Sequence, residues 1–124
     1  MILRCRGRKD LIMFLDLHTH TTASDGQYRP DEIIQMAVNL ELEAIAITDH
    51  DTVGGIAEAR EAARSLGVNF IPGIEISTQM EEEIHVLGYF IDENNEQLQS
   101  ACQEFMDSRL GRSNRIAEYL SIQP

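Results

Sequence analysis

The chain has 124 residues, of which 43% are hydrophobic and 25% charged, and its formal net charge is −11. This length suits one domain with a hydrophobic core, but it is short for a complete α/β barrel, which needs about 250 residues. The acidic charge argues against binding of duplex nucleic acid through a basic surface, and no apolar run approaches the roughly 20 residues of a membrane span.

The cysteines and the first residues indicate the class of protein. Cys5 and Cys102 lie far apart and outside any CxxC motif, so we expect a reduced, cytoplasmic protein without a thiolate zinc site. Four basic residues precede a five-residue apolar run, which is shorter than the secretory signal core of about 7 to 15 residues. We predict a disordered leader over residues 1–12 and the N-terminal portion of one domain over residues 13–124.

The first half of the chain alternates strand and helix patterns. Pro30, followed by two acidic residues, is typical of a helix start, and Gly67 is typical of a helix end. The run 44–47 is apolar on both faces, as in a parallel strand covered on both sides. We expect, in order, a strand at 11–15, a helix from 30 to about 42, a strand at 44–47 and a helix at 56–66.

The second half predicts two strands and a helix. Residues 68–76 read as a third strand broken by Pro72, and residues 84–90 as a fourth. Asn94 with Gln97 resembles a capping box at the start of a last helix. The resulting order, β-α-β-α-β-β-α, indicates an α/β fold with parallel strands joined by right-handed crossovers.

Histidines and carboxylates gather where these strands end. His18 and His20 are two residues apart at the end of the first strand, so their side chains point the same way. The carboxyl ends of parallel strands share one edge of the sheet, which should bring further groups beside them. These are His50, Asp25 and Glu75, with His85 near the start of the fourth strand. Histidine with carboxylate is a ligand set for zinc, manganese or iron.

Each of these residues also has an ordinary structural interpretation. His50 alone could be a surface residue or a hydrogen-bond partner, and His85 could be a histidine of the core. Glu75 alone could lie in a solvated turn, but its apolar neighbours on both sides place it on the opposite face, where a buried carboxylate needs a partner. Asp49 and Asp51 fit turn formers or residues that support ligands better than ligands.

Five motifs in order resemble the PHP (polymerase and histidinol phosphatase) domain family. They are Asp-Leu-His-Thr-His-Thr at 16–21, Ser-Asp-Gly at 24–26, Thr-Asp-His-Asp at 48–51, Pro-Gly-Ile-Glu-Ile-Ser at 72–77 and His-Val-Leu-Gly-Tyr at 85–89. Within that family the chain looks most like the small phosphoesterases that act on nucleoside 3′,5′-bisphosphates and on short RNA 5′ ends.

The resemblance implies a distorted (β/α)7 barrel with up to three divalent metal ions (Mn, Zn or Fe) at its C-terminal edge. It implies that His18 and His20 hold one metal, that Glu75 bridges it to a second held by His85, and that the remaining two ligands hold the third. Those two are Asp25 and His50. Family members add a later cysteine or histidine and a final Asp-x-His, whereas no histidine follows His85 here. We therefore expect the chain to be the N-terminal part of such a barrel.

For the complete domain, the function expected from the resemblance is metal-dependent hydrolysis of phosphomonoesters or phosphodiesters of nucleotides or short oligonucleotides by an activated water. The 124-residue chain alone can be inactive, because each metal would lack at least one ligand. Bound cations make a phosphorylated substrate compatible with an acidic protein. Two alternatives stay open: a histidinol phosphatase or polymerase-type exonuclease of the same family, and a non-catalytic metal-binding fragment. An open sheet would also leave an edge that favours self-association.

Overall fold

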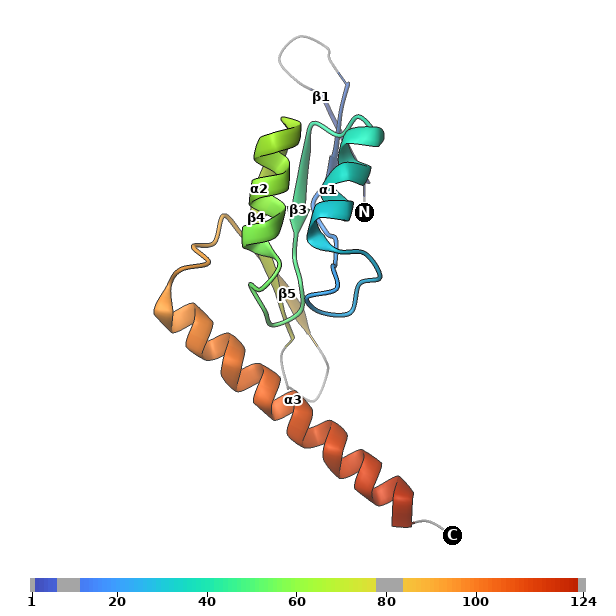
Figure 1. Ribbon diagram of the computed structural model, residues 1–124, viewed down its shortest axis with the longest axis vertical. Helices are drawn as coiled ribbons and strands as arrows, with labels where there is room; N and C mark the ends of the chain where they lie inside the picture. Colours follow the sequence, from blue (N-terminus) through green and yellow to red (C-terminus); the bar gives the residue numbers. More distant parts are fainter. Residues whose placement is uncertain (1, 7–11, 78–83, 123–124) are drawn as a thin grey trace.

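The computed structural model describes residues 2–6, 12–77 and 84–122, whose course Figure 1 shows. The side chains of residues 4–6, 12, 109–110 and 112–122 lie outside the description. The elements in chain order are β1 (Ile2–Arg6), β2 (Ile12–Asp16), α1 (Pro30–Asn39), β3 (Ala44–Ile47), α2 (Ile56–Leu66), β4 (Asn69–Ser77), β5 (His85–Tyr89) and α3 (Glu96–Ile122).

The five strands form one mixed sheet in the order β1-β2-β3-β4-β5. β2, β3 and β4 run parallel, because α1 and α2 supply the crossovers that parallel neighbours require. β1 and β5 pair antiparallel with β2 and β4, since the connections 7–11 and 78–84 are shorter than the dozen or so residues of a parallel crossover. The α/β order predicted from the sequence is present, with an antiparallel strand at each edge.

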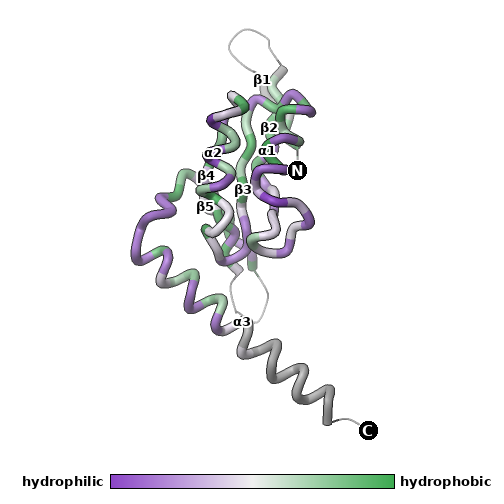
Figure 2. Tube along the Cα trace, viewed as in Figure 1, coloured by the Kyte–Doolittle hydropathy of each residue, from purple (hydrophilic) through white to green (hydrophobic). Residues whose placement is uncertain are grey.

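The core lies between the sheet and the two helices that cover one of its faces. In the view of Figure 1, α1 and α2 lie on either side of β3, and they pack against each other. Figure 2 shows that the hydrophobic residues run along β3 between these helices. The central side chains are fully buried and include Ile34, Ile45, Ile47, Ile56 and Ala59. This packing fixes the strand ends that carry the polar residues.

The helix boundaries follow local signals. α1 begins with Pro30 at its first position, and the Glu32 carboxylate accepts the backbone N–H of Arg29 at 2.8 Å. The helix ends at Asn39, before the predicted Leu42, because Glu41 takes a positive φ of 53° and turns Leu42 back into the core. α2 has the predicted bounds and ends at Gly67, whose φ of 74° is left-handed.

β4 is continuous through Pro72, where the sequence predicted a break. The Pro72 carbonyl accepts the Ile91 N–H, and a residue's carbonyl and nitrogen face the same edge of a strand. The ring nitrogen of Pro72 therefore faces away from β3, beyond the point where pairing with β5 ends at Gly73. The missing N–H interrupts no bond to β3, so the proline is tolerated.

Two further predictions need correction at the ends of the chain. Residues 2–6 form β1, paired with β2 from Ile2↔Asp16 to Arg6↔Ile12, where a disordered leader over residues 1–12 was expected. Residues 1 and 7–11 of that leader lie outside the described residues. At α3 the cap is Asn95, whose Oδ1 accepts the Leu98 N–H at 3.0 Å, and not Asn94. α3 then projects away from the sheet (Figure 1).

Candidate metal centre

The predicted site residues come together at the edge of the sheet formed by the carboxyl ends of the parallel strands. His18 and His20 follow β2, and His50 follows β3. Glu75 lies near the end of β4, and His85 opens β5. Asp25, in the loop between β2 and α1, reaches the same place. All six residues that the sequence singled out therefore share one edge.

Strand register explains how β4 and β5 contribute. Ser77 pairs with His85 and Glu75 with Leu87, so Glu75 and His85 are diagonal neighbours on one face of the sheet. On the other side of β4, Glu75 forms a parallel bridge with His50. Backbone pairing thus places two histidines beside one carboxylate.

Glu75 is the centre of the cluster. Its Oε2 lies 2.8 Å from His18 Nε2, 3.1 Å from His20 Nε2 and 3.7 Å from His50 Nε2. Its Oε1 lies 2.6 Å from His85 Nδ1. The Glu75 side chain is only 5% exposed, so its interpretation as a residue of a solvated turn is wrong. One buried carboxylate contacts all four imidazoles of the chain.

Asp25 extends the cluster toward solvent. Its Oδ1 lies 3.5 Å from His20 Nδ1, and its Oδ2 lies 3.8 Å from His50 Nε2. The rings of His20 and His50 stack with their centroids 4.6 Å apart. Three overlapping groups have ligand atoms within 4.8 Å of one another: His18, His20 and Glu75; His20, Asp25 and His50; His50, Glu75 and His85.

The electrostatics favour the protonation states that bind metal. Burial raises the pKa of the Glu75 carboxyl, but hydrogen bonds from His18 and His85 outweigh it, so the net pKa lies below the usual value. Burial lowers the pKa of His20, and the neighbouring His50 lowers it further. An ionised carboxylate and a neutral imidazole are the forms with free lone pairs for a cation.

One unsatisfied atom indicates that a cation fits here. Among the described residues, Nδ1 of His20 is a buried side-chain nitrogen without a hydrogen-bond partner. A buried polar atom of this kind requires an explanation, and an ion is one. Because it stands among imidazole nitrogens and carboxylate oxygens, the donor set suits zinc, manganese or iron. The chain's own groups thus fit a metal site, and the role of each as a ligand remains a proposal.

Further residues make hydrogen bonds around the candidate ligands. Asp49 is buried and accepts hydrogen bonds from Thr21 and Ser24. Asp51 accepts the Ser77 N–H, so both aspartates support the site as expected. The Tyr89 hydroxyl donates to the Leu17 carbonyl at 2.8 Å, next to His18. Thr21 and Ser24 fall within the family motifs, but their bonds to Asp49 could not be predicted, because that partner lies in a different loop.

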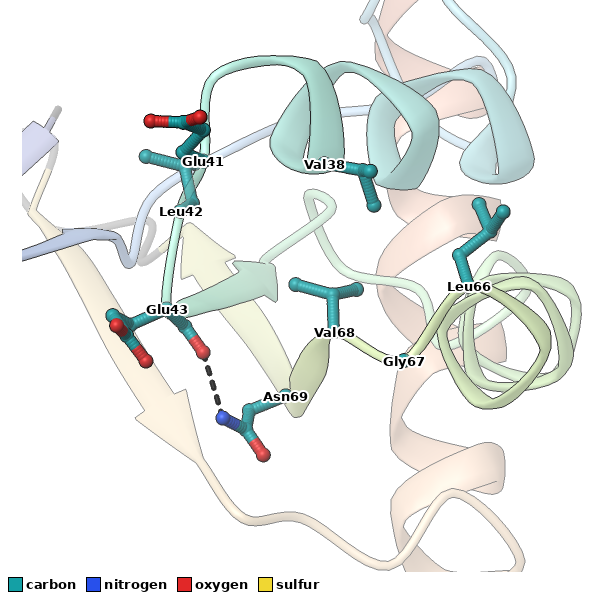
Figure 3. Close-up of a pocket in the computed structure, with 8 residues that line it drawn as sticks. All are labelled: Val38, Glu41, Leu42, Glu43, Leu66, Gly67, Val68 and Asn69. Atoms are coloured by element: carbon teal, nitrogen blue, oxygen red, sulfur yellow. Dashed lines mark hydrogen bonds between the residues drawn. The ribbon is translucent and has the colours of Figure 1, made fainter.

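A separate pocket of about 240 Å³ lies at the opposite end of the sheet (Figure 3). It opens between the C-terminal ends of the two helices that cover the sheet, and Asn69 Nδ2 closes one side by donating to the Glu43 carbonyl at 2.7 Å. Its residues are Val38, Glu41, Leu42, Glu43, Leu66, Gly67, Val68 and Asn69. Its lining has two glutamates but no histidine, and no candidate metal-ligand group among the described residues includes any of its residues.

The comparisons with known proteins agree with this geometry. The sequence profile of the PHP domain matches residues 16–113. The chain is 44% identical over 108 residues to the 5′-3′ exoribonuclease Rnm of Escherichia coli, and it is 35% identical over 107 residues to the 3′,5′-nucleoside bisphosphate phosphatase of Chromobacterium violaceum. A structure from Bifidobacterium adolescentis, named as a metal-dependent phosphoesterase, matches with a TM-score of 0.80 and 37% identity.

These matches cover most of this chain and less than half of each relative. The match to the Escherichia coli protein covers 85% of this chain and 37% of that protein. Each of the other two matches covers 86% of this chain and 38% of the relative. The predicted fold class, part of a PHP barrel, is confirmed by the structural match. None of the helices within the described residues is long and apolar enough to span a membrane.

Proposed function

Because the chain belongs to the PHP domain family, we propose that it carries the first part of a metal-dependent phosphoesterase site. The observation that carries the proposal is the buried Glu75 carboxylate in contact with four imidazoles. A carboxylate with two free oxygens can bridge two cations, and the surrounding nitrogens can complete their shells. Similarity to an exoribonuclease and a bisphosphate phosphatase supports phosphate esters as the substrate class.

The proposed ligands divide into groups around the bridging carboxylate. His18, His20 and Glu75 would hold a first ion, and Glu75 and His85 would hold a second. Asp25 and His50 hold a third at the exposed rim. When bound, divalent cations polarise phosphoryl oxygens and lower the pKa of a water, which becomes the nucleophile.

The side chains of this site would hold and orient the cations, and none of these side chains needs to act as a nucleophile. The stacked rings of His20 and His50 keep their nitrogens on one side of Glu75. Asp25, with a side chain 67% exposed, lies where a substrate would enter. The cations offset the carboxylate charge, so a phosphate group can approach despite a net charge of −11.

The finer features are proposals as well. The ions are manganese, zinc or iron, up to three, because the ligand set mixes imidazole with carboxylate. The substrate is a small phosphorylated nucleotide or short oligonucleotide, in line with the names of the relatives. The cytoplasmic location rests on cysteine usage alone. Self-association through β5 stays a prediction, since within the described part of the chain β5 pairs only with β4.

Release of inorganic phosphate tests the proposal. The purified chain is incubated with MnCl2 and, in separate reactions, with a nucleoside 3′,5′-bisphosphate, a short 5′-phosphorylated RNA and histidinol phosphate. We expect release from the bisphosphate, and we expect EDTA or His50→Ala to abolish it. His50→Ala removes a nitrogen 3.7 Å from Glu75 without creating a new charge.

The rivals predict other outcomes. Release from histidinol phosphate alone favours a histidinol phosphatase of the same family, and cleavage of RNA without release from the bisphosphate favours an exonuclease. A chain that binds Mn²⁺ but hydrolyses none of the three substrates contradicts the phosphoesterase proposal for this chain and favours a non-catalytic metal-binding fragment.

A further inference from the structure

Asp49 joins three of the four segments that carry the proposed metal ligands, although it is not a member of any ligand group. Its side chain is 1% exposed, and both of its oxygens accept hydrogen bonds. Oδ1 accepts the Thr21 backbone N–H at 2.7 Å and the Ser24 hydroxyl at 2.6 Å. Oδ2 accepts the Thr21 hydroxyl at 2.7 Å.

The donors lie next to two of the three candidate ligands in the loop between β2 and α1. Thr21 directly follows His20, and Ser24 directly precedes Asp25. Thr21 is fully buried, and its hydroxyl oxygen also accepts the Ala23 N–H at 3.1 Å. His20 and Asp25 therefore each have a neighbour held by the same carboxylate, which ties the position of both residues to Asp49.

The backbone of Asp49 fixes the rest of the site. The residue immediately precedes His50, and its carbonyl accepts the Glu75 N–H at 3.1 Å. The loops after β2 and β3 lie side by side in Figure 1, as these contacts require. The single residue Asp49 therefore connects the loop that carries His20 and Asp25 with His50 and with Glu75.

The packing around the carboxylate leaves no room for a different arrangement. A Cβ on Gly55 would lie 2.9 Å from Asp49 Oδ2 and 3.1 Å from Thr21 Oγ1. The neighbouring helix start is equally close, with Pro30 Cγ at 3.2 Å from the same point. Gly55 and Pro30 thus pack closely beside Asp49 and Thr21, and both of these residues are almost fully buried, so solvent has little access to the bonds between them.

We infer that Asp49 is a positioning residue of the metal centre, which holds Asp25 and His20 in register with His50 and Glu75. The inference rests on the proposed metal site and adds a residue that contacts no ion. Residues that orient metal ligands commonly affect metal affinity by about 10- to 100-fold. Loss of this contact should weaken mainly the binding of the ion proposed for Asp25 and His50.

A double-mutant cycle on Mn²⁺ binding tests the inference. Free Mn²⁺ is measured by electron paramagnetic resonance in titrations of the wild type, Asp49→Asn, Asp25→Ala and the double variant. Asp49→Asn keeps the shape but replaces one acceptor oxygen by an amide that can only donate. We expect Asp49→Asn to weaken binding by about 10- to 100-fold in the wild-type background, and to add little when Asp25 is already alanine.

Two matched controls separate positioning from a general loss of structure. Asp92→Asn makes the same chemical change in an exposed loop after β5, where Asp92 accepts the Asn94 N–H, and it should leave Mn²⁺ binding unchanged. Should Asp49→Asn fail to fold, as judged by circular dichroism, Thr21→Val removes one of the three bonds, with the exposed Thr22→Val as its control. Thr21→Val should weaken Mn²⁺ binding, and Thr22→Val should not.

The outcomes distinguish this inference from the proposed function. Unchanged Mn²⁺ binding in a folded Asp49→Asn, or an equal loss with and without Asp25, refutes positioning and leaves the metal site intact. A wild-type chain that binds no Mn²⁺ refutes the metal site itself, and with it this role of Asp49.

Discussion

Gly26 offers a sharp test of how the loop after β2 holds His20. A Cβ at this position would lie 2.3 Å from the His20 carbonyl oxygen and 2.7 Å from the Thr21 nitrogen, where real contacts stay above 3.0 Å. Both atoms belong to the backbone, so no side-chain rotation relieves the clash. In Gly26→Ala the loop must open by at least about 0.7 Å, from 2.3 to 3.0 Å. Metal sites hold bond lengths to within about 0.2 Å, so this shift should displace His20 from its ligand position.

Gly26→Ala should therefore lower the free energy of unfolding by about 1–3 kcal/mol, as overpacking does, and weaken Mn²⁺ binding by about 10- to 100-fold. Urea unfolding and Mn²⁺ titration measure the two effects. Gly54→Ala is the control in the adjacent loop, because its nearest contact is the movable Thr52 hydroxyl at 3.3 Å. A Gly26→Ala protein that binds Mn²⁺ as tightly as the wild type would refute the proposed geometry of the loop.

Three further predictions concern stability. Ile47→Ala should lower the free energy of unfolding by about 2–5 kcal/mol, because Ile47 is fully buried against the helices. Leu40→Ala, at a side chain that is 61% exposed, should lower it far less. Equal losses in urea unfolding would contradict the assigned core. Gly111→Ala should raise the stability of α3 by about 0.5–1 kcal/mol, since a Cβ there meets nothing within 4 Å, and a lower helix content by circular dichroism would contradict this. Mn²⁺ at 100 times its Kd should stabilise the fold by about 2.7 kcal/mol in thermal unfolding, and EDTA should reverse the gain; a melting temperature independent of Mn²⁺ would argue against binding to the folded state.

Local sequence signals were sufficient to predict the bounds of a helix or strand wherever these bounds depend only on the residues of that element. β3 and α2 have the predicted bounds because an apolar run and a helical period end at clear signals, such as Gly67. The end of α1 was harder to predict, because the left-handed turn at Glu41 depends on Leu42 returning to the core. The continuity of β4 through Pro72 could not be predicted either, since it depends on which edge of the strand faces a partner.

The clustering of the candidate ligands could be predicted from the sequence, but the hydrogen bonds that support them could not. The sequence predicted that strand ends would gather the histidines and Glu75, and the structure places them together. The link from Thr21 to Asp49 spans 28 residues and joins two loops, so no local pattern indicates it. β1 was missed for a similar reason, because its strand character depends on pairing with β2.

Titration of Mn²⁺ into the wild-type chain and into Glu75→Gln tests the metal centre most directly. Glu75 contacts all four histidines, and its replacement by an amide removes the charge and the bridging oxygen with little change in volume. We predict that the wild type binds Mn²⁺ and that Glu75→Gln binds it at least about 10-fold more weakly. Equal affinity of the two proteins, or no binding by the wild type, would contradict a metal site built around Glu75.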